Sequence, residues 1–114
     1  MKKILTGLFC MLALTLAQAE TATPGAAEVR ALGLLNGEAL ACKQMALVDR
    51  VRGRIIHEAP KTREIGEIFE AATTERFLAM GQKNESCPDG RALAERIETA
   101  TQALRAAFAA AHGK

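Results

Sequence analysis

Apolar residues recur at the three- and four-residue spacing of an α-helix through most of this chain, and no run of strand-like alternation interrupts them. The first helical stretch extends from Glu28 to His57. Asn36-Gly37 lies inside it and can split it, because Asn and Gly readily adopt left-handed or capping conformations. We therefore expect a short helix over residues 28–35 and a longer one over residues 37–58.

Pro60 marks the next boundary, because proline disfavours helical geometry at the residue before it and suits the first turn of a new helix. The apolar spacing then predicts a helix over residues 60–81, which Gly81 ends in a left-handed cap. A polar loop over 82–87 follows, and Ser86-Cys87-Pro88-Asp89 has the pattern of a helix start. The expected buried stripes are Ile65, Ile68, Phe69, Ala72, Phe77 and Met80 in the first of these helices, and Leu93, Ile97, Ala100, Leu104, Ala107, Phe108 and Ala111 in the last.

This order of segments predicts an all-α fold. We expect a small three-helix bundle, to which the segment in front of Asn36 adds a short fourth helix. The helices over 37–58 and 60–81 should form an antiparallel hairpin around Ala59, because the connection between them is short. In that register Arg50 falls opposite Glu67.

The first 19 residues have the pattern of a secretory signal peptide. Lys2 and Lys3 precede an apolar run over residues 4–17, and Ala17-Gln18-Ala19 has the small residues of a cleavage site. The run is about 14 residues, whereas a membrane-spanning helix needs about 20, so a retained membrane helix is the weaker interpretation. We expect residues 1–19 to be removed and the protein to be periplasmic or secreted. The next segment, 20–27, is small and polar with a Pro-Gly break, which predicts a disordered leader.

The mature chain is expected to form one domain with no net charge. Cleavage leaves about 95 residues, enough for one modest core, which we place in a single helical domain over residues 28–111 with a frayed end at 112–114. Two of the 15 Lys and Arg residues lie in the predicted signal peptide, so 13 remain against 13 Asp and Glu. A neutral exported chain is a poor candidate for binding nucleic acid or an anionic membrane surface.

The mature chain keeps two cysteines, Cys42 and Cys87, since Cys10 would be removed with the signal peptide. In an oxidising compartment an even pair without a competitor predicts a disulfide. The bridge would close a loop of about 46 residues and contribute roughly 4 kcal/mol in the chain-entropy model. It would attach the start of the last helix to the middle of the first long helix.

Metal, haem and redox chemistry have little support in the residue spacing. Cys42, Met45, His57 and Met80 are soft ligands, but Met45 and His57 lie about 18 Å apart along a helix, and a bonded Cys42 offers no thiolate. No Cys-x-x-Cys pair or Cys-x-x-Cys-His motif for thiol catalysis or haem attachment is present. We therefore expect no metal and no cofactor.

The stretch from Arg50 to Arg63 holds the one local excess of basic residues. Arg50 and Arg54 share a helical face, and Lys61 and Arg63 follow the turn, where they would meet an anion or an acidic segment of a partner. The simpler interpretation is that these cations stabilise a helix end and pair with the neighbouring glutamates. His57 in the same stretch would titrate near neutral pH, but no nucleophile accompanies it.

A stripe of small residues, Gly33, Gly37 and Ala41, would let another helix approach closely. It serves either packing inside the bundle or contact with a second protein. Leu32 and Leu35 beside it form an apolar ridge, which becomes a partner surface if the front segment does not fold back onto the bundle.

These features favour a small exported helical protein that acts by protein binding, as an accessory subunit or adaptor for another exported or envelope protein. An enzyme is not expected, because no pair of groups is spaced to act as acid and base or as nucleophile and base. One alternative is a periplasmic stress chaperone, a holdase that unmasks apolar surface. A less favoured alternative is a helical bundle that binds a small ligand or a metal.

Overall fold

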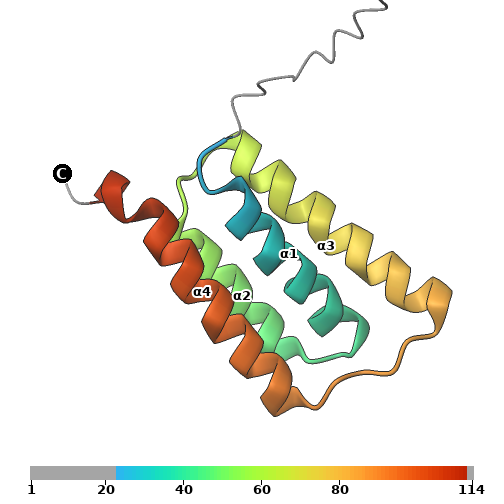
Figure 1. Cartoon of the computed structure of the whole chain (residues 1–114). Coiled ribbons are helices and arrows are strands. Elements are labelled where there is room, and N and C mark those ends of the chain that lie inside the picture. The colour runs from blue at the N-terminus through green and yellow to red at the C-terminus, as the bar shows by residue number, and fades with distance from the viewer. Residues whose placement is uncertain (1–22, 113–114) are drawn as a thin grey trace, which may run out of the picture.

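The structure is a computed structural model that describes residues 23–112, with side chains described as far as Ala109. In this part of the chain it contains four α-helices and no strand: α1 (Ala26–Ala41), α2 (Met45–Glu58), α3 (Arg63–Lys83) and α4 (Gly90–His112) (Figure 1). The all-α prediction is confirmed, and the front helix is a full element and not a short addition. The predicted signal peptide over 1–19 lies outside the described residues.

Helix α1 is the centre of the arrangement. Helices α2, α3 and α4 each pack against it, and α2 and α4 also pack against each other (Figure 1). Within the described residues, no α carbon of α3 lies within 8 Å of one in α2 or α4. The domain is therefore a three-helix bundle of α1, α2 and α4, to which α3 is attached on the outer side of α1.

Helices α1 and α3 run in the same direction. Gly33 of α1 lies against Phe69 and Ala72, and Gly37, one turn further on, lies against Thr73. Helices α2 and α4 run together in the opposite direction (Figure 1). Each helix thus reverses the direction of the one before it, but α2 and α3 are separated by α1.

The predicted hairpin of residues 37–58 with 60–81 is wrong. Helix α1 turns back after Ala41, so the antiparallel neighbour of α2 is α1. The connection over 59–62 then carries the chain to the far side of α1. Arg50 does not meet Glu67; the ion pair that joins α2 to α3 is Arg52–Glu70, with nitrogen and oxygen 3.6 Å apart.

The predicted helix break at Asn36-Gly37 is also wrong. Both residues are buried inside α1, and the chain turns at 42–44, where Lys43 has a φ of 59°. The Asn36 side chain donates from Nδ2 to Thr73 Oγ1 at 3.1 Å. Gly37 is needed for packing and not for a turn, because an added Cβ would lie 2.8 Å from the Cβ of Arg76.

Other helix ends differ from the prediction by a few residues. Helix α3 begins at Arg63 because Thr62 caps it, with its Oγ1 accepting from the Ile65 N–H at 3.2 Å. It ends at Lys83, where Asn84 takes the left-handed conformation expected of Gly81, with φ 50°. The last helix begins at Gly90.

Part of the segment expected to be a disordered leader belongs to the domain. Ala26 and Ala27 form the start of α1, and Gly25 precedes them with a φ of 78°. Gly25 touches the ring of Phe108, so a side chain at this position would not fit. Thr23 Oγ1 donates to a carboxylate oxygen of Glu64 on α3 at 3.0 Å. Residues 20–22 lie outside the described range.

The core contains most of the residues that the helical spacing placed there. Phe77 is the exception, because 45% of it is exposed although it was expected in the buried stripe of α3. Ile68 and Ala100 are partly buried against the core, Ala107 is partly buried, and the side chain of Ala111 lies outside the described residues. The larger buried side chains are Val29, Leu32, Leu35, Leu47, Val48, Val51, Ile65, Phe69, Met80, Leu93, Ile97, Leu104 and Phe108.

The predicted disulfide between Cys42 and Cys87 is confirmed, with α carbons 5.6 Å apart. Its place in the fold differs from the prediction. Cys42 lies at the end of α1 and Cys87 in the loop before α4, so the bond joins the α1–α2 turn to the α3–α4 loop. Both cysteines lie at the same end of the bundle, so the bond fixes that end.

A buried carboxylate joins the three helices that meet at this end. Glu38 of α1 is 4% exposed and accepts from Arg76 Nη2 of α3 at 2.9 Å and from Arg96 Nη1 of α4 at 2.8 Å. Arg76 also pairs with Glu85 in the α3–α4 loop at 2.9 Å. The hydrogen bond to Glu38 raises the pKa of the Arg76 guanidinium, which stays charged. Glu38 therefore bridges two helices whose described α carbons all lie more than 8 Å apart.

Replacing Glu38 by glutamine should destabilise the fold strongly. The substitution leaves two guanidinium groups facing a neutral amide, so we expect the free energy of unfolding to fall by about 2–3 kcal/mol. Urea unfolding followed by circular dichroism measures the loss. Glu95→Gln on the exposed side of α4 is the matched control and should change stability by less than about 0.5 kcal/mol. Equal stability of the two variants would contradict the bridging role.

Acid should weaken the contact between α2 and α4 through Glu58. Arg105 Nε donates to Glu58 Oε1 at 2.9 Å, and this hydrogen bond is the main cause that lowers the pKa of Glu58 below its ordinary value of 4.5. A carboxyl group with a lowered folded pKa stabilises the fold above its unfolded pKa, and that stabilisation is lost as the pH falls through the folded pKa. Arg105→Gln should therefore flatten the decline of unfolding free energy from about pH 5 downward. Identical pH profiles of wild type and variant would refute this assignment.

Candidate functional site

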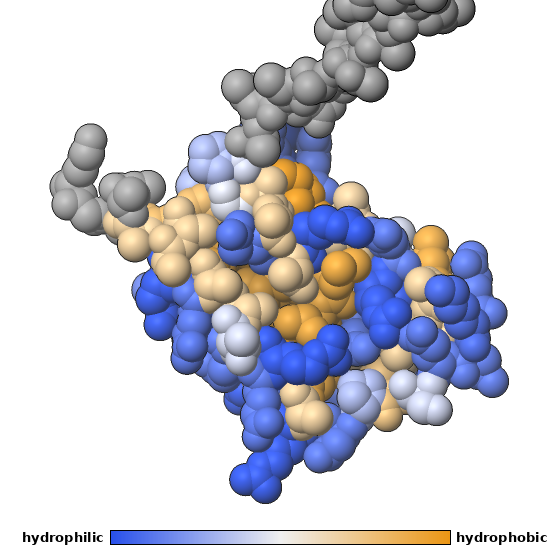
Figure 2. All heavy atoms as spheres, in the orientation of Figure 1, coloured by the Kyte–Doolittle hydropathy of each residue, from blue (hydrophilic) through white to orange (hydrophobic). Residues whose placement is uncertain are grey.

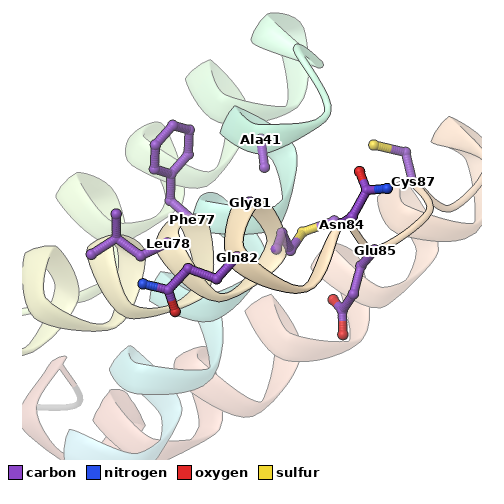
Figure 3. Close-up of a pocket in the computed structure, with 9 residues that line it drawn as sticks. Ala41, Phe77, Leu78, Gly81, Gln82, Asn84, Glu85 and Cys87 are labelled. Atoms are coloured by element: carbon purple, nitrogen blue, oxygen red, sulfur yellow. The ribbon is translucent and has the colours of Figure 1, made fainter.

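A cavity of about 420 Å³ opens beside the disulfide, and we call it the notch. The last turns of α3 form one wall, the end of α1 lies behind it, and the α3–α4 loop closes the other side (Figure 3). Its lining is mainly apolar with amide groups at the rim, a composition typical of binding sites. The lining residues are Ala41, Phe77, Leu78, Met80, Gly81, Gln82, Asn84, Glu85 and Cys87.

Two large apolar side chains stand exposed at the mouth of the notch. Phe77 is 45% exposed and Leu78 is 51% exposed, and Figure 3 shows both on one side of Gly81, with Asn84 and Cys87 on the other. Leu78 follows Phe69 by nine positions, which at about 100° per residue places it on the side of α3 opposite the buried Phe69. Helix α3 has one neighbouring helix, α1, among those described. The position of α3 in the fold therefore exposes this pair.

Gly81 keeps the notch open. A Cβ added at this position would meet no described atom within 4 Å. The residue lies inside α3 and has no positive φ, so the backbone does not require glycine here. The missing side chain leaves open space at the surface. At the rim, the backbone N–H of Asn84 caps α3 by donating to the carbonyl oxygen of Met80, and the carboxylate of Glu85 pairs with Arg76.

The chemistry of the notch is that of apolar contact and hydrogen bonding. Cys87 is in the disulfide and carries no free thiol. The carboxylate in the lining, that of Glu85, is neutralised by Arg76. Such a site can bind an apolar side chain or a small apolar group, with Gln82 available at the rim for a hydrogen bond.

A second apolar surface lies between α1 and α4, and we call it the seam. It encloses about 710 Å³, and Figure 2 shows an apolar band on this face with charged residues on its flanks. A neighbouring cavity of about 330 Å³ shares Leu34 and Arg96 with it, and there Arg30 pairs with Glu75 at 2.7 Å. The residues that line the seam are Ala31, Leu34, Leu35, Ala92, Glu95, Arg96, Thr99, Ala100 and Ala103.

The small-residue stripe serves packing inside the bundle. Gly33 and Gly37 are buried against α3, and Leu32 and Leu35 belong to the core. The segment in front of Asn36 packs inside the bundle as part of α1, so Leu32 and Leu35 are not available to a partner. Ala41 differs from the others, because it lines the notch.

The structure does not gather the four predicted cations into one cavity. Arg50 and Arg54 line a shallow cavity of about 340 Å³ on α2, from which Lys61 and Arg63 are absent. Arg54 pairs with Glu98 at 3.1 Å and Arg63 with Glu67 at 2.9 Å. Between residues 23 and 112 neither Arg50 nor Lys61 has a carboxylate within 4.0 Å. Pairing with a neighbouring glutamate, the simpler interpretation, accounts for Arg63, whereas Arg54 pairs with a glutamate of α4.

Metal binding and membrane insertion also find no support in the described residues. No three of their His, Cys, Asp and Glu side chains are grouped so that they could hold a metal ion. None of the four helices combines the length and the apolar character that a membrane crossing requires. His57 is exposed and lies next to Glu58, with Nδ1 and Oε1 3.3 Å apart.

No protein-family model, no curated protein and no solved structure matches this chain. The notch and the seam are therefore interpreted from their own residues.

The sequence contained a signal for the notch that the helical periodicity obscured. Phe77 was assigned to the buried stripe of α3 and Gly81 to its cap. The informative feature is Leu78, a bulky apolar residue nine positions after Phe69 and therefore on the opposite side of the helix from the buried stripe. The position of α3 on the outside of α1 was the missing information.

Leu78 should be dispensable for folding. Because half of the side chain is already exposed, Leu78→Asp should change the free energy of unfolding by less than about 1 kcal/mol. Phe69 is 4% exposed on the buried face of the same helix, so Phe69→Ala should cost about 3–5 kcal/mol. Urea unfolding of both variants tests the difference, and comparable losses would contradict the assignment of Leu78 to the surface.

Proposed function

We propose that this chain is a small exported helical protein that acts by binding proteins through the notch and the seam, as an accessory subunit or adaptor. The observation that carries the proposal is the exposure of Phe77 and Leu78 next to the open position of Gly81. Large apolar side chains beside a cavity are the usual anchors of protein interfaces.

The energy available at the notch supports a specific but modest contact. Complete burial of a Leu or Phe side chain contributes about 1.5–3 kcal/mol, and about half of that remains to be gained by Phe77 and Leu78. A stable interface also needs on the order of 1,200–2,000 Å² in total, so neighbouring residues of α3 must contribute. The notch would act as the centre of such an interface.

The groups around the notch favour binding over catalysis. Arg76 and Glu85 pair with each other, Arg76 also pairs with Glu38, and the sulfur of Cys87 is in the disulfide. Groups held in this way stabilise the shape of a site, whereas acid–base or nucleophilic catalysis needs a free group of matched pKa. We therefore assign the protein no reaction of its own.

A periplasmic or secreted location agrees with two independent features. The first 19 residues have the pattern of a signal peptide, and the domain contains the disulfide between Cys42 and Cys87. Disulfides persist in oxidising compartments and are rare in the cytosol. The partner would accordingly be another exported or envelope protein.

The holdase alternative receives less support. A holdase activated by stress would keep its apolar surface covered until conditions change. Phe77 and Leu78 are accessible in the folded domain, which favours binding under ordinary conditions.

Site-specific photo-crosslinking in cells that export the protein tests the proposal. A photoreactive residue in place of Leu78 should give a discrete crosslinked product, because this side chain would lie inside an interface. The matched control is Ile56, an equally bulky exposed residue (61%) near the end of α2, where no product is expected. No product at position 78, or the same products at both positions, would overturn the proposal.

A further inference from the structure

We infer that the disulfide between Cys42 and Cys87 is a redox switch for the notch. Reduction of the bond by a dithiol releases the α3–α4 loop from the end of α1 and weakens binding at the notch, while the four described helices keep their arrangement. This inference rests on the proposed function, since it names a control on the same binding surface.

The disulfide is accessible at the surface of the domain. Cys87 is exposed and Cys42 is partly exposed. Both lie outside the regular helices, Cys42 at the end of α1 and Cys87 in the loop that crosses from α3 to α4 (Figure 1). A thiolate must reach a sulfur atom to exchange with it, so exposed disulfides are the ones that serve as labile or regulatory bonds.

The disulfide holds the part of the loop that forms a wall of the notch. Glu85 at the start of the loop has its own attachments, since its N–H donates to the carbonyl oxygen of Met80 at 3.1 Å and its carboxylate pairs with Arg76 at 2.9 Å. Residues 86–88 form no hydrogen bond and no ion pair within the described range. Their attachment to the end of α1 is therefore the bond at Cys87.

Other contacts hold the helices at this end without the disulfide. Glu38 of α1 accepts from Arg76 of α3 at 2.9 Å and from Arg96 of α4 at 2.8 Å. The close contact of Gly37 with α3 is made by helix residues alone. Proteins open locally where few contacts must break, at a lower cost than global unfolding. Loss of the disulfide should therefore free the loop and leave the helices packed.

The chemical step is thiol–disulfide exchange with a dithiol reductant. A thiolate of the reductant attacks one sulfur of the bond, the other sulfur leaves as a thiolate, and a mixed disulfide forms. The second thiol of the reductant then attacks the mixed disulfide and releases the protein. Two electrons and two protons pass to the protein, which becomes a dithiol, and the reductant becomes a disulfide.

Release of the loop removes contacts that a partner would use. Cys87 lines the notch on the side of Gly81 opposite Phe77 and Leu78 (Figure 3). An apolar side chain seated beside Gly81 would be enclosed from both sides only while the loop is attached. The oxidised protein should therefore bind and the reduced protein should bind more weakly.

Thiol labelling tests whether the bond can be reduced in the folded domain. The exported protein is incubated with dithiothreitol in the absence of denaturant and then with a maleimide. We expect two labels by mass spectrometry, while circular dichroism reports an unchanged helical content. Reduction that requires urea, or that abolishes the helical signal, would overturn the switch.

Tryptic cleavage tests whether loss of the bond frees the loop locally. In the double variant Cys42→Ser/Cys87→Ser, cleavage after Lys83 at the start of the loop should be at least about tenfold faster than in the oxidised wild type. Lys61 is the matched control, an exposed lysine in the connection at the other end of the bundle. An unchanged rate at Lys83, or an equal increase at both sites, contradicts a local release.

Photo-crosslinking in cells that export the protein tests the effect on binding. With a photoreactive residue in place of Leu78, the double serine variant should give at least about fivefold less product than the wild type at equal amounts of exported protein. A product that the variant retains in full overturns the switch and leaves the proposed function standing. Absence of any product from the wild type overturns both.

Discussion

The close approach of α1 and α3 at Gly33 and Gly37 is the contact on which the arrangement depends. An added Cβ on Gly33 would lie 2.7 Å from that of Ala72, so any other residue would push the two helices apart. Because this face of α1 receives α3, the hairpin partner α2 and the last helix α4 must occupy the remaining sides. The backbone of α3 therefore lies away from both, although the Arg52–Glu70 ion pair reaches it from α2, and its outward face stays exposed.

Polar contacts hold this apolar arrangement in register. The carboxylate of Glu38 accepts from a guanidinium of α3 and from another of α4, although no described α carbons of those two helices lie within 8 Å of each other. Asn36 adds a buried hydrogen bond between α1 and α3. Buried polar groups of this kind stabilise a fold when they are paired and penalise every arrangement that leaves them unpaired. Glu38 is paired on both oxygens, whereas Asn36 is paired only through Nδ2, because its buried Oδ1 has no hydrogen-bond partner among the described residues.

The sequence predicted what depends on local spacing, and it failed where a tertiary contact decides. Helical content, most core positions and the Cys42–Cys87 pair followed from periodicity and cysteine number. Asn36-Gly37 has the local preference for a break, but in the fold the lack of a side chain at Gly37 is needed for contact with α3. The notch was missed for the same reason, since the exposure of Phe77 depends on which helices α3 touches.

The disulfide between Cys42 and Cys87 shapes one wall of the notch. Cys87 forms part of the notch, and its bond to Cys42 holds the α3–α4 loop against the end of α1. The loop has a second attachment in the Arg76–Glu85 ion pair, but its charges are partly exposed and such pairs contribute little by themselves. The glycine contact between α1 and α3 does not involve the disulfide. The packing of α1 against α3 is therefore independent of the disulfide, whereas the wall of the notch depends on it.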